Sequence, residues 1–104
     1  MYHILRTDEF DSWLAKLKYL RAKAKILARI RSAEFGNLGD VESVGTGLSE
    51  LRIHYGPGYR IYFKKQGKVL LLVLSGGTKN TQRKDIERAK SLMKKYEDIV
   101  DEWS

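Results

Sequence analysis

A predicted β-hairpin around a Gly-Pro-Gly turn carries Arg52, His54 and Arg60. Arginine presents a planar, permanently charged group that fits phosphate oxygens, and histidine exchanges a proton near neutral pH. Metal-free cleavage of RNA needs a base for the 2′-hydroxyl, cations for the phosphorane charge and an acid for the departing 5′-oxygen. The residue types therefore indicate a phosphate site capable of this chemistry. Solvated arginines are also common on open sheet faces, and this simpler interpretation stays open.

The alternation of the hairpin strands places these polar groups on one face. If the loop is symmetric about Pro57, three pairs lie opposite each other: His54 and Arg60, Arg52 and Tyr62, and Glu50 and Lys64. A bulge in the loop would shift this register by one residue. Neighbouring cations repel, so a bound phosphate would explain the arrangement. The interpretation requires both arginines to converge on an exposed face; internal ion pairs with no open surface around them would end it.

The elements that position the hairpin are predicted in the order strand, two helices, three strands, helix. A strand at 2–6 precedes a helix that Thr7 caps and whose apolar spacing runs to Leu20. A second helix, about 21–35, is expected to turn Leu27 inward. The remaining predictions are a connecting loop at 36–47, strands at 48–55, 59–65 and 68–75, and a helix after "SGGTKN". The apolar run "VLLLVL" (69–74) predicts an interior strand buried on both faces. The class is α+β.

The composition is that of one globular domain spanning 1–104. No stretch reaches the roughly 20 apolar residues of a membrane span, and the N-terminus turns acidic before any run of signal-peptide length. Cysteine is absent, which excludes disulfides and thiolate metal sites. The two histidines belong to no local cluster at metal-ligand spacing, and no P-loop pattern occurs. We therefore expect a cytoplasmic protein without metal or cofactor.

The charge balance favours a polyanionic partner such as RNA, DNA or an acidic protein. The net charge is +7, and an acidic tail at 97–104 leaves 20 basic and nine acidic side chains in the rest of the chain. Four cations, Lys18, Arg21, Lys25 and Arg29, share one face if a single helix runs through them. A helix break near residues 18–21 would scatter this stripe. The charge alone is equally compatible with a role in solubility.

Three sequence strings, in this order, resemble the RelE/ParE toxin superfamily, in its HigB-like, phage-derived "addiction module killer protein" branch. They are "GNLGD", "GLSELRIHYGPGYRIYF" and "LLLVLSGGTKNTQRKDIERA", and the resemblance covers about residues 1–96. It implies a RelE-like α+β fold, in which an N-terminal strand and a helical hairpin pack on a small, mainly antiparallel sheet with a C-terminal helix. It also implies the toxin of a type II toxin-antitoxin system, which in the RelE and HigB branches cuts mRNA in the ribosomal A site.

The resemblance implies five catalytic positions in this sequence. Arg52 and Arg60 would clamp the scissile phosphate, and Lys79 would neutralise charge. His54 has the reference pKa best suited to a general acid or base, although this position is often acidic in close relatives. Asp85 stands where some relatives have a catalytic tyrosine; it could orient a cation or act as a base, and a role as a first-turn helix acid is equally open.

The implied partners are the ribosome with its mRNA and a cognate antitoxin of helix-turn-helix type, with operator DNA reached only through the antitoxin. The cations Lys18, Arg21, Lys25 and Arg29 would grip ribosomal RNA. Tyr62 and Lys64, on the polar face of the hairpin, would contact RNA as well, the tyrosine by stacking on a base. No membrane partner is expected.

Two alternatives to a ribosome-dependent mRNA endonuclease stay open at this stage. One is a ParE-like inhibitor that binds DNA gyrase and cleaves nothing, because the same fold supports both functions. The other is an inactive phage-derived protein kept as part of an antitoxin-bound repressor. For the nuclease we expect that Arg60→Ala abolishes growth arrest and leaves the fold intact.

Overall fold

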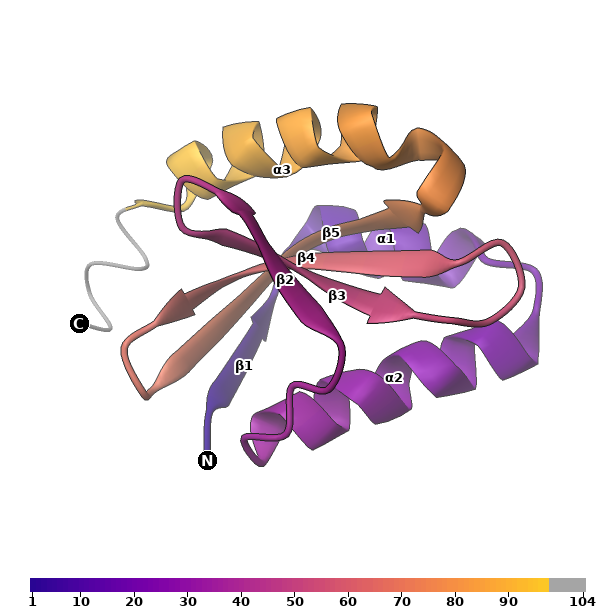
Figure 1. Ribbon diagram of the computed structural model, residues 1–104, viewed down its shortest axis with the longest axis horizontal. Helices are drawn as coiled ribbons and strands as arrows, with labels where there is room; N and C mark the ends of the chain where they lie inside the picture. Colours follow the sequence, from indigo (N-terminus) through magenta and orange to yellow (C-terminus); the bar gives the residue numbers. More distant parts are fainter. Residues whose placement is uncertain (98–104) are drawn as a thin grey trace.

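The computed structural model describes residues 1–97 and has an α+β fold, as expected (Figure 1). The elements are β1 (His3–Arg6), α1 (Asp8–Lys16), α2 (Leu20–Glu34), β2 (Val41–Gly45), β3 (Leu48–Ile53), β4 (Tyr59–Gln66), β5 (Leu70–Thr78), the short 3-10 helix η1 (Lys79–Thr81) and α3 (Gln82–Lys95). The strands form one sheet in the order β1-β5-β4-β3-β2. Only the β1–β5 pair is parallel among these strands. The acidic tail beyond Glu97 lies outside the described residues.

Helices cover both faces of the sheet, with α2 and α3 on opposite sides (Figure 1). The core under α1 and α2 is built from Phe10, Leu14, Ile26 and Ile30 together with Ile61 and Phe63 of β4. The core under α3 is smaller and contains Leu48, Tyr62, Leu72, Leu74, Ala89 and Leu92. Strand β5 lies between β1 and β4, and its residues 70–74 are buried, which confirms the prediction for this apolar run. Val69 precedes the strand and is exposed.

The first helix begins as predicted but is shorter than expected. The Thr7 side chain accepts a hydrogen bond from the Phe10 amide at 3.0 Å and donates one to the Leu74 carbonyl at 2.6 Å, so the cap also ties α1 to β5. Helix α1 ends at Lys16, and α2 begins at Leu20, which is 81% exposed. The apolar spacing therefore does not continue to residue 20. The second helix also keeps Leu27 exposed, contrary to the prediction.

The segment predicted as a plain loop at 36–47 contains an edge strand, β2. Its Val41 pairs with Leu51 of β3 in antiparallel register. Glycines with positive φ lie before the strand at Gly39 and after it at Gly47, where the chain turns. The glycine-rich composition therefore reflects the two turns, which flank a short strand that the prediction missed.

The β3–β4 hairpin has a longer loop than predicted. Ile53 pairs with Tyr59, so residues 54–58 form a five-residue loop, which the Gly58 amide closes with a 3.0 Å hydrogen bond to the Tyr55 carbonyl. Arg60 therefore lies opposite Arg52 instead of His54. This register differs from the predicted one by two residues. Because side chains alternate with a period of two, the strand residues keep the faces that were predicted for them.

Candidate functional site

A fully buried carboxylate lies on the hairpin face that α3 covers. Glu50 is 0% exposed. Its Oε1 accepts hydrogen bonds from Arg60 Nη1 at 2.7 Å and Arg52 Nε at 3.2 Å. Its Oε2 accepts from the Tyr62 hydroxyl at 3.1 Å and from Gln82 Nε2 at 2.8 Å. These five side chains form what we call the Glu50 cluster, and the four donors offset the cost of burying a charge.

The strand register explains how the cluster assembles. Arg52 lies opposite Arg60 and Glu50 lies opposite Tyr62, all on one face of the hairpin. Gln82 reaches the same carboxylate from the first residue of α3. Burial, together with the adjacent Glu50 charge, raises the pKa of Tyr62 above its ordinary value. The tyrosine hydroxyl therefore stays protonated and remains a donor to the cluster.

The two hairpin arginines converge as expected, but the open cationic face that was predicted for them is wrong. The side chain of Arg60 is 12% exposed and that of Arg52 is 27% exposed. Both form ion pairs with Glu50, and Arg52 also pairs with Glu42 of β2. The reason is that α3 covers this face and that two acidic side chains balance the two guanidinium charges. A phosphate site made of two free arginines is therefore not present, although both ion-paired side chains keep a partly exposed surface.

Lys79 lies at the turn next to the hairpin loop. Its backbone amide donates a 2.8 Å hydrogen bond to the Gly58 carbonyl, so η1 is tied to the β3–β4 loop. The residue itself is exposed. Arg60 lies two residues after Gly58, on strand β4, which pairs with β5. The structure thus brings Lys79 to the same end of the sheet as the Glu50 cluster.

Asp85 lies in the first turn of α3, beside the same end of the sheet. It accepts a hydrogen bond from the Thr81 hydroxyl. A Cβ placed on Gly77, the partner of Arg60 in β5, would collide with this carboxylate, so the Asp85 side chain occupies the space above Gly77. Asp85 therefore lies in the first turn of α3 and also next to Gly77, the residue that pairs with Arg60.

His54 does not join the arginines, which corrects the predicted pairing with Arg60. Strand β3 ends at Ile53, so the alternation no longer governs residue 54. Its Nε2 lies 2.5 Å from Asp40 Oδ2, and it lines a surface pocket that α2 borders with Lys25 and Arg29. The hydrogen bond from His54 holds the pKa of Asp40 below its usual range. His54 thus belongs to a separate part of the surface.

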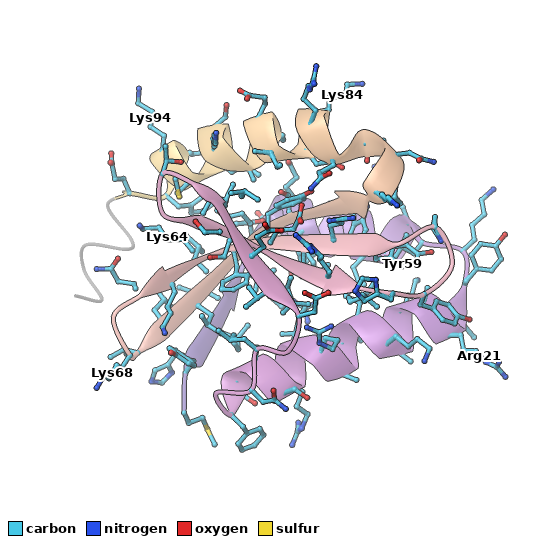
Figure 2. The ribbon with its side chains drawn as sticks, viewed as in Figure 1. Arg21, Tyr59, Lys64, Lys68, Lys84 and Lys94 are labelled. Atoms are coloured by element: carbon cyan, nitrogen blue, oxygen red, sulfur yellow. The ribbon has the colours of Figure 1, made fainter. Side chains whose placement is uncertain are left out.

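The predicted cationic stripe is scattered, because the chain breaks between α1 and α2. Lys18 lies in the break, whereas Arg21 and Lys25 are exposed on α2, where Figure 2 shows Arg21 pointing outward. Arg29 points inward, and its guanidinium donates to the Arg52 carbonyl at 2.5 Å and to the Leu38 carbonyl at 2.8 Å. An RNA-binding role for Arg29 is therefore replaced by one in fastening α2 to the loop before β2.

Of two further predicted RNA contacts, base stacking by Tyr62 is wrong, because the side chain is buried, whereas the contact by Lys64 stays a prediction. Tyr62 is 0% exposed and lies under α3, so it cannot stack on a base. Lys64 is half-buried and opposite Leu48, with its amino group beside Gly47 at the β2–β3 turn. It therefore lies four residues along β4 from Arg60, away from the cluster.

The sequence reasoning missed the exposed cations around the start of α3. Arg83 and Lys84 line a surface hollow with Asn80, Thr81 and Glu87. Figure 2 shows Lys84 pointing away from α3. Together with Lys79 these two residues form what we call the α3 rim. The signal was present in the run "TKNTQRK", which directly follows an apolar strand and places several cations at one strand-to-helix turn.

The Glu50 cluster was also missed as a unit. Glu50 and Arg52 alternate with the apolar residues Leu51 and Ile53 on one strand, and a charged residue in such a pattern can be buried if a partner helix covers it. Within residues 1–97, no group of three or more His, Asp or Glu side chains is placed to hold a metal ion. In the same part of the chain, no helix has the length and apolar character to cross a membrane.

The protein has a small α+β fold in which two hairpin arginines are held on a buried glutamate beneath α3. A comparison with models of known protein families finds no match. The chain is 60% identical over 89 residues to an uncharacterized protein of Haemophilus influenzae, a match that covers 86% of this chain and 90% of that protein. The chain belongs to the same family as this Haemophilus influenzae protein.

Proposed function

We propose that the protein is the toxin of a type II toxin-antitoxin system and cleaves mRNA on the ribosome without a metal. The observation that supports this best is the gathering of Arg60, Lys79 and Asp85 at one end of the sheet. The hairpin and C-terminal strings that resemble the RelE/ParE superfamily support it as well. The net charge of +7 suits a nucleic-acid partner and a ribosomal target in the cytoplasm.

In this proposal the exposed and the covered cations have different tasks. The α3 rim binds the RNA backbone, because its cations reach solvent. Arg60 lies beneath and stabilises the charge that develops on the phosphorane. A guanidinium has five N–H donors, and Glu50 engages Arg60 through Nη1, so further donors remain for a phosphate oxygen.

The proton transfer is assigned to Asp85 in place of His54. A general base must lie within hydrogen-bond reach of the proton that it takes, and His54 is paired with Asp40 in the pocket beside α2. Asp85 accepts the proton of the 2′-hydroxyl as the 2′-oxygen bonds to phosphorus. The bond between phosphorus and the 5′-oxygen then breaks, with Lys79 neutralising the charge on the departing 5′-oxygen while that oxygen takes a proton from water. A carboxylate is a weak base at neutral pH, so the reaction depends on the ribosome to position the RNA.

The alternative is a non-enzymatic inhibitor of DNA gyrase, and one observation favours it. Arg52 and Arg60 are balanced by Glu42 and Glu50, which leaves little free charge on the hairpin for catalysis. An inhibitor that cleaves nothing would not need that charge. The two functions differ in their cellular effects: cut transcripts in one case, and filamentation with a DNA-damage response in the other.

The experiment is induced expression in a bacterial host with Arg60→Lys as the test variant. Lysine keeps a positive charge beside Glu50 and therefore preserves the fold, but it lacks the planar fork that binds phosphate oxygens. Arg88→Lys is the matched control, because Arg88 is paired with Glu9 on the surface between α3 and α1. We expect the wild type and the control to arrest growth and cut transcripts. Arg60→Lys is expected to cut transcripts at a rate about 100-fold lower and to arrest growth correspondingly less.

The proposed antitoxin is tested in the same cells. Co-expression of a neighbouring small gene that encodes a helix-turn-helix protein is expected to restore growth. The encoded protein should co-purify with the toxin. Intact transcripts in arrested cells that form filaments would replace the nuclease with the gyrase inhibitor. A protein without any effect at high expression would contradict both functions.

A further inference from the structure

We propose that Glu50 is the positioning residue of this site: its buried carboxylate orients Arg60 and docks the first turn of α3, which carries Asp85, against the hairpin. This inference rests on the proposed function. Glu50 cannot touch RNA itself, because its side chain is 0% exposed. It would act through the groups that it holds.

Glu50 is unusual for its burial. Among residues 1–97, Glu50 is the only charged residue that is buried. The four donors that surround it come from three elements, β3, β4 and α3. Well-packed apolar side chains often replace a buried ion pair without loss of stability. A buried carboxylate at this point is therefore better explained by what it positions than by the stability that it adds.

The first task of Glu50 is to keep two like charges together. Arg52 and Arg60 lie directly opposite each other on neighbouring strands, an arrangement in which cations repel. Both donate to the same oxygen, Oε1 of Glu50. This shared acceptor restricts the rotamers of both side chains, so Arg60 has less conformational freedom to lose when a phosphate arrives.

The second task is to set the distance between the arginines and α3. The other oxygen, Oε2, accepts from Gln82 at 2.8 Å, and Gln82 is the first residue of α3. Asp85 follows three residues later, so it lies near the same side of the helix. The two oxygens of one carboxylate thus connect the group that would stabilise the transition state to the turn that carries the proposed base.

The variant that tests this inference is Glu50→Gln, which keeps the shape of the side chain and removes its charge. Glu9→Gln is the matched control, because it removes a carboxylate from an arginine pair on the surface. The assay is cleavage of mRNA on programmed ribosomes, with the rate at saturating protein and the protein concentration for half-maximal rate measured separately. Rates are expressed per folded molecule from the near-ultraviolet circular dichroism signal.

We expect Glu50→Gln to lower the saturating rate at least about tenfold, with the half-maximal concentration changed by less than about twofold. The control should change neither. If a destabilised Glu50→Gln does not fold, Gln82→Met removes one neutral donor and is expected to lower the rate several-fold. A rate per folded molecule that equals the wild type in Glu50→Gln, or in Gln82→Met where that variant is used, overturns the inference.

A second readout does not depend on activity. In the ¹⁵N-labelled protein, the Nε–Hε signal of Arg52 and the Nη–H signals of Arg60 are expected to be protected from solvent exchange, because these groups donate to Glu50. Glu50→Gln should remove that protection, while the signals of Arg88 are unaffected. Unchanged signals overturn the inference. Wild-type protein that cuts no RNA contradicts the proposed function instead, and the spectra then still decide whether Glu50 orients the arginines.

Discussion

Arg52 and Arg60 lie directly opposite each other on β3 and β4, and both donate to Oε1 of Glu50. Two cations that would repel are thereby held together by one buried anion. The polar side of the hairpin is thus an interior cluster between the sheet and α3, and the exposed cations of the α3 rim lie around the start of α3.

Loss of Arg60 should destabilise the fold. Arg60→Ala leaves Glu50 with one charged partner fewer, and breaking a buried pair costs about 3–5 kcal/mol. The ion pair with buried Glu50 thus makes an intact fold in Arg60→Ala, as predicted from the sequence, the wrong expectation. In the double variant Glu50→Leu with Arg60→Ala, we expect much of the lost stability to return without any toxicity. Urea unfolding of the wild type, Arg60→Ala and the double variant measures this, and a double variant that is no more stable than Arg60→Ala would contradict it.

Two neighbouring glycines should respond differently to a methyl group. In Gly77→Ala the new Cβ meets the end of the Asp85 side chain, which can swing away, so we expect a small loss of stability and a large loss of cleavage. In Gly76→Ala it overlaps the indole ring of Trp13, which packs against Tyr59, so we expect a loss of about 1–3 kcal/mol.

Thermal unfolding and cleavage per folded molecule distinguish these two effects. The Gly76→Ala protein should keep its activity per folded molecule, because Trp13 lies on the α1 side of the sheet. Full activity of Gly77→Ala, with the Asp85 carboxylate displaced, would refute the role of Asp85 as the base.

The α3 rim should carry the salt dependence of RNA binding. Replacing Lys79, Arg83 and Lys84 by alanine removes three exposed cations, and each contact with a single-stranded phosphate contributes about 0.7 to the logarithmic salt slope. We expect the triple variant to lose a slope of about 2 in anisotropy titrations with a short RNA. Lys68→Ala is the control, because Lys68 lies at the β4–β5 turn, at the other end of the sheet (Figure 2). An equal loss in the control would mean that RNA binds without regard to the rim.

The ion pair between α1 and α3 should make a small, pH-dependent contribution to stability. Hydrogen bonds from Arg88 hold the pKa of Glu9 below its ordinary value. Because the folded pKa is lowered, the contribution is complete above the ordinary pKa of Glu9 and is lost as the pH falls through the lowered value.

Thermal unfolding of Arg88→Gln tests this dependence. We expect a slightly lower Tm than that of the wild type at about pH 7 and an equal Tm at about pH 2. The effect is small because both side chains are partly exposed. A difference that persists at the lower pH would show that Arg88 acts through packing.

Local patterns were sufficient to predict much of this fold. The cap at Thr7 and the apolar run of β5 both depend on neighbouring residues, and the structure confirms them. The hairpin faces were also right, because a register error of two residues preserves the alternation of side chains.

The missing parts depend on contacts between distant residues. The loop length of the hairpin is set by a turn geometry that the Gly-Pro-Gly composition does not determine. His54 was therefore predicted to lie in the strand, whereas the strand ends at Ile53. The burial of Glu50 depends on α3, which begins 32 residues later at Gln82. Strand β2 was not predicted, because the glycines of its two flanking turns give the segment the composition of a loop.

The most direct test of the proposed function is to add the purified protein to translating ribosomes and map the 5′ ends of the mRNA. We predict new ends within the A-site codon that require the ribosome, persist with Arg88→Lys and fall about 100-fold with Arg60→Lys. Intact mRNA at all protein concentrations, with inhibition of DNA supercoiling by gyrase in a parallel assay, would contradict the nuclease.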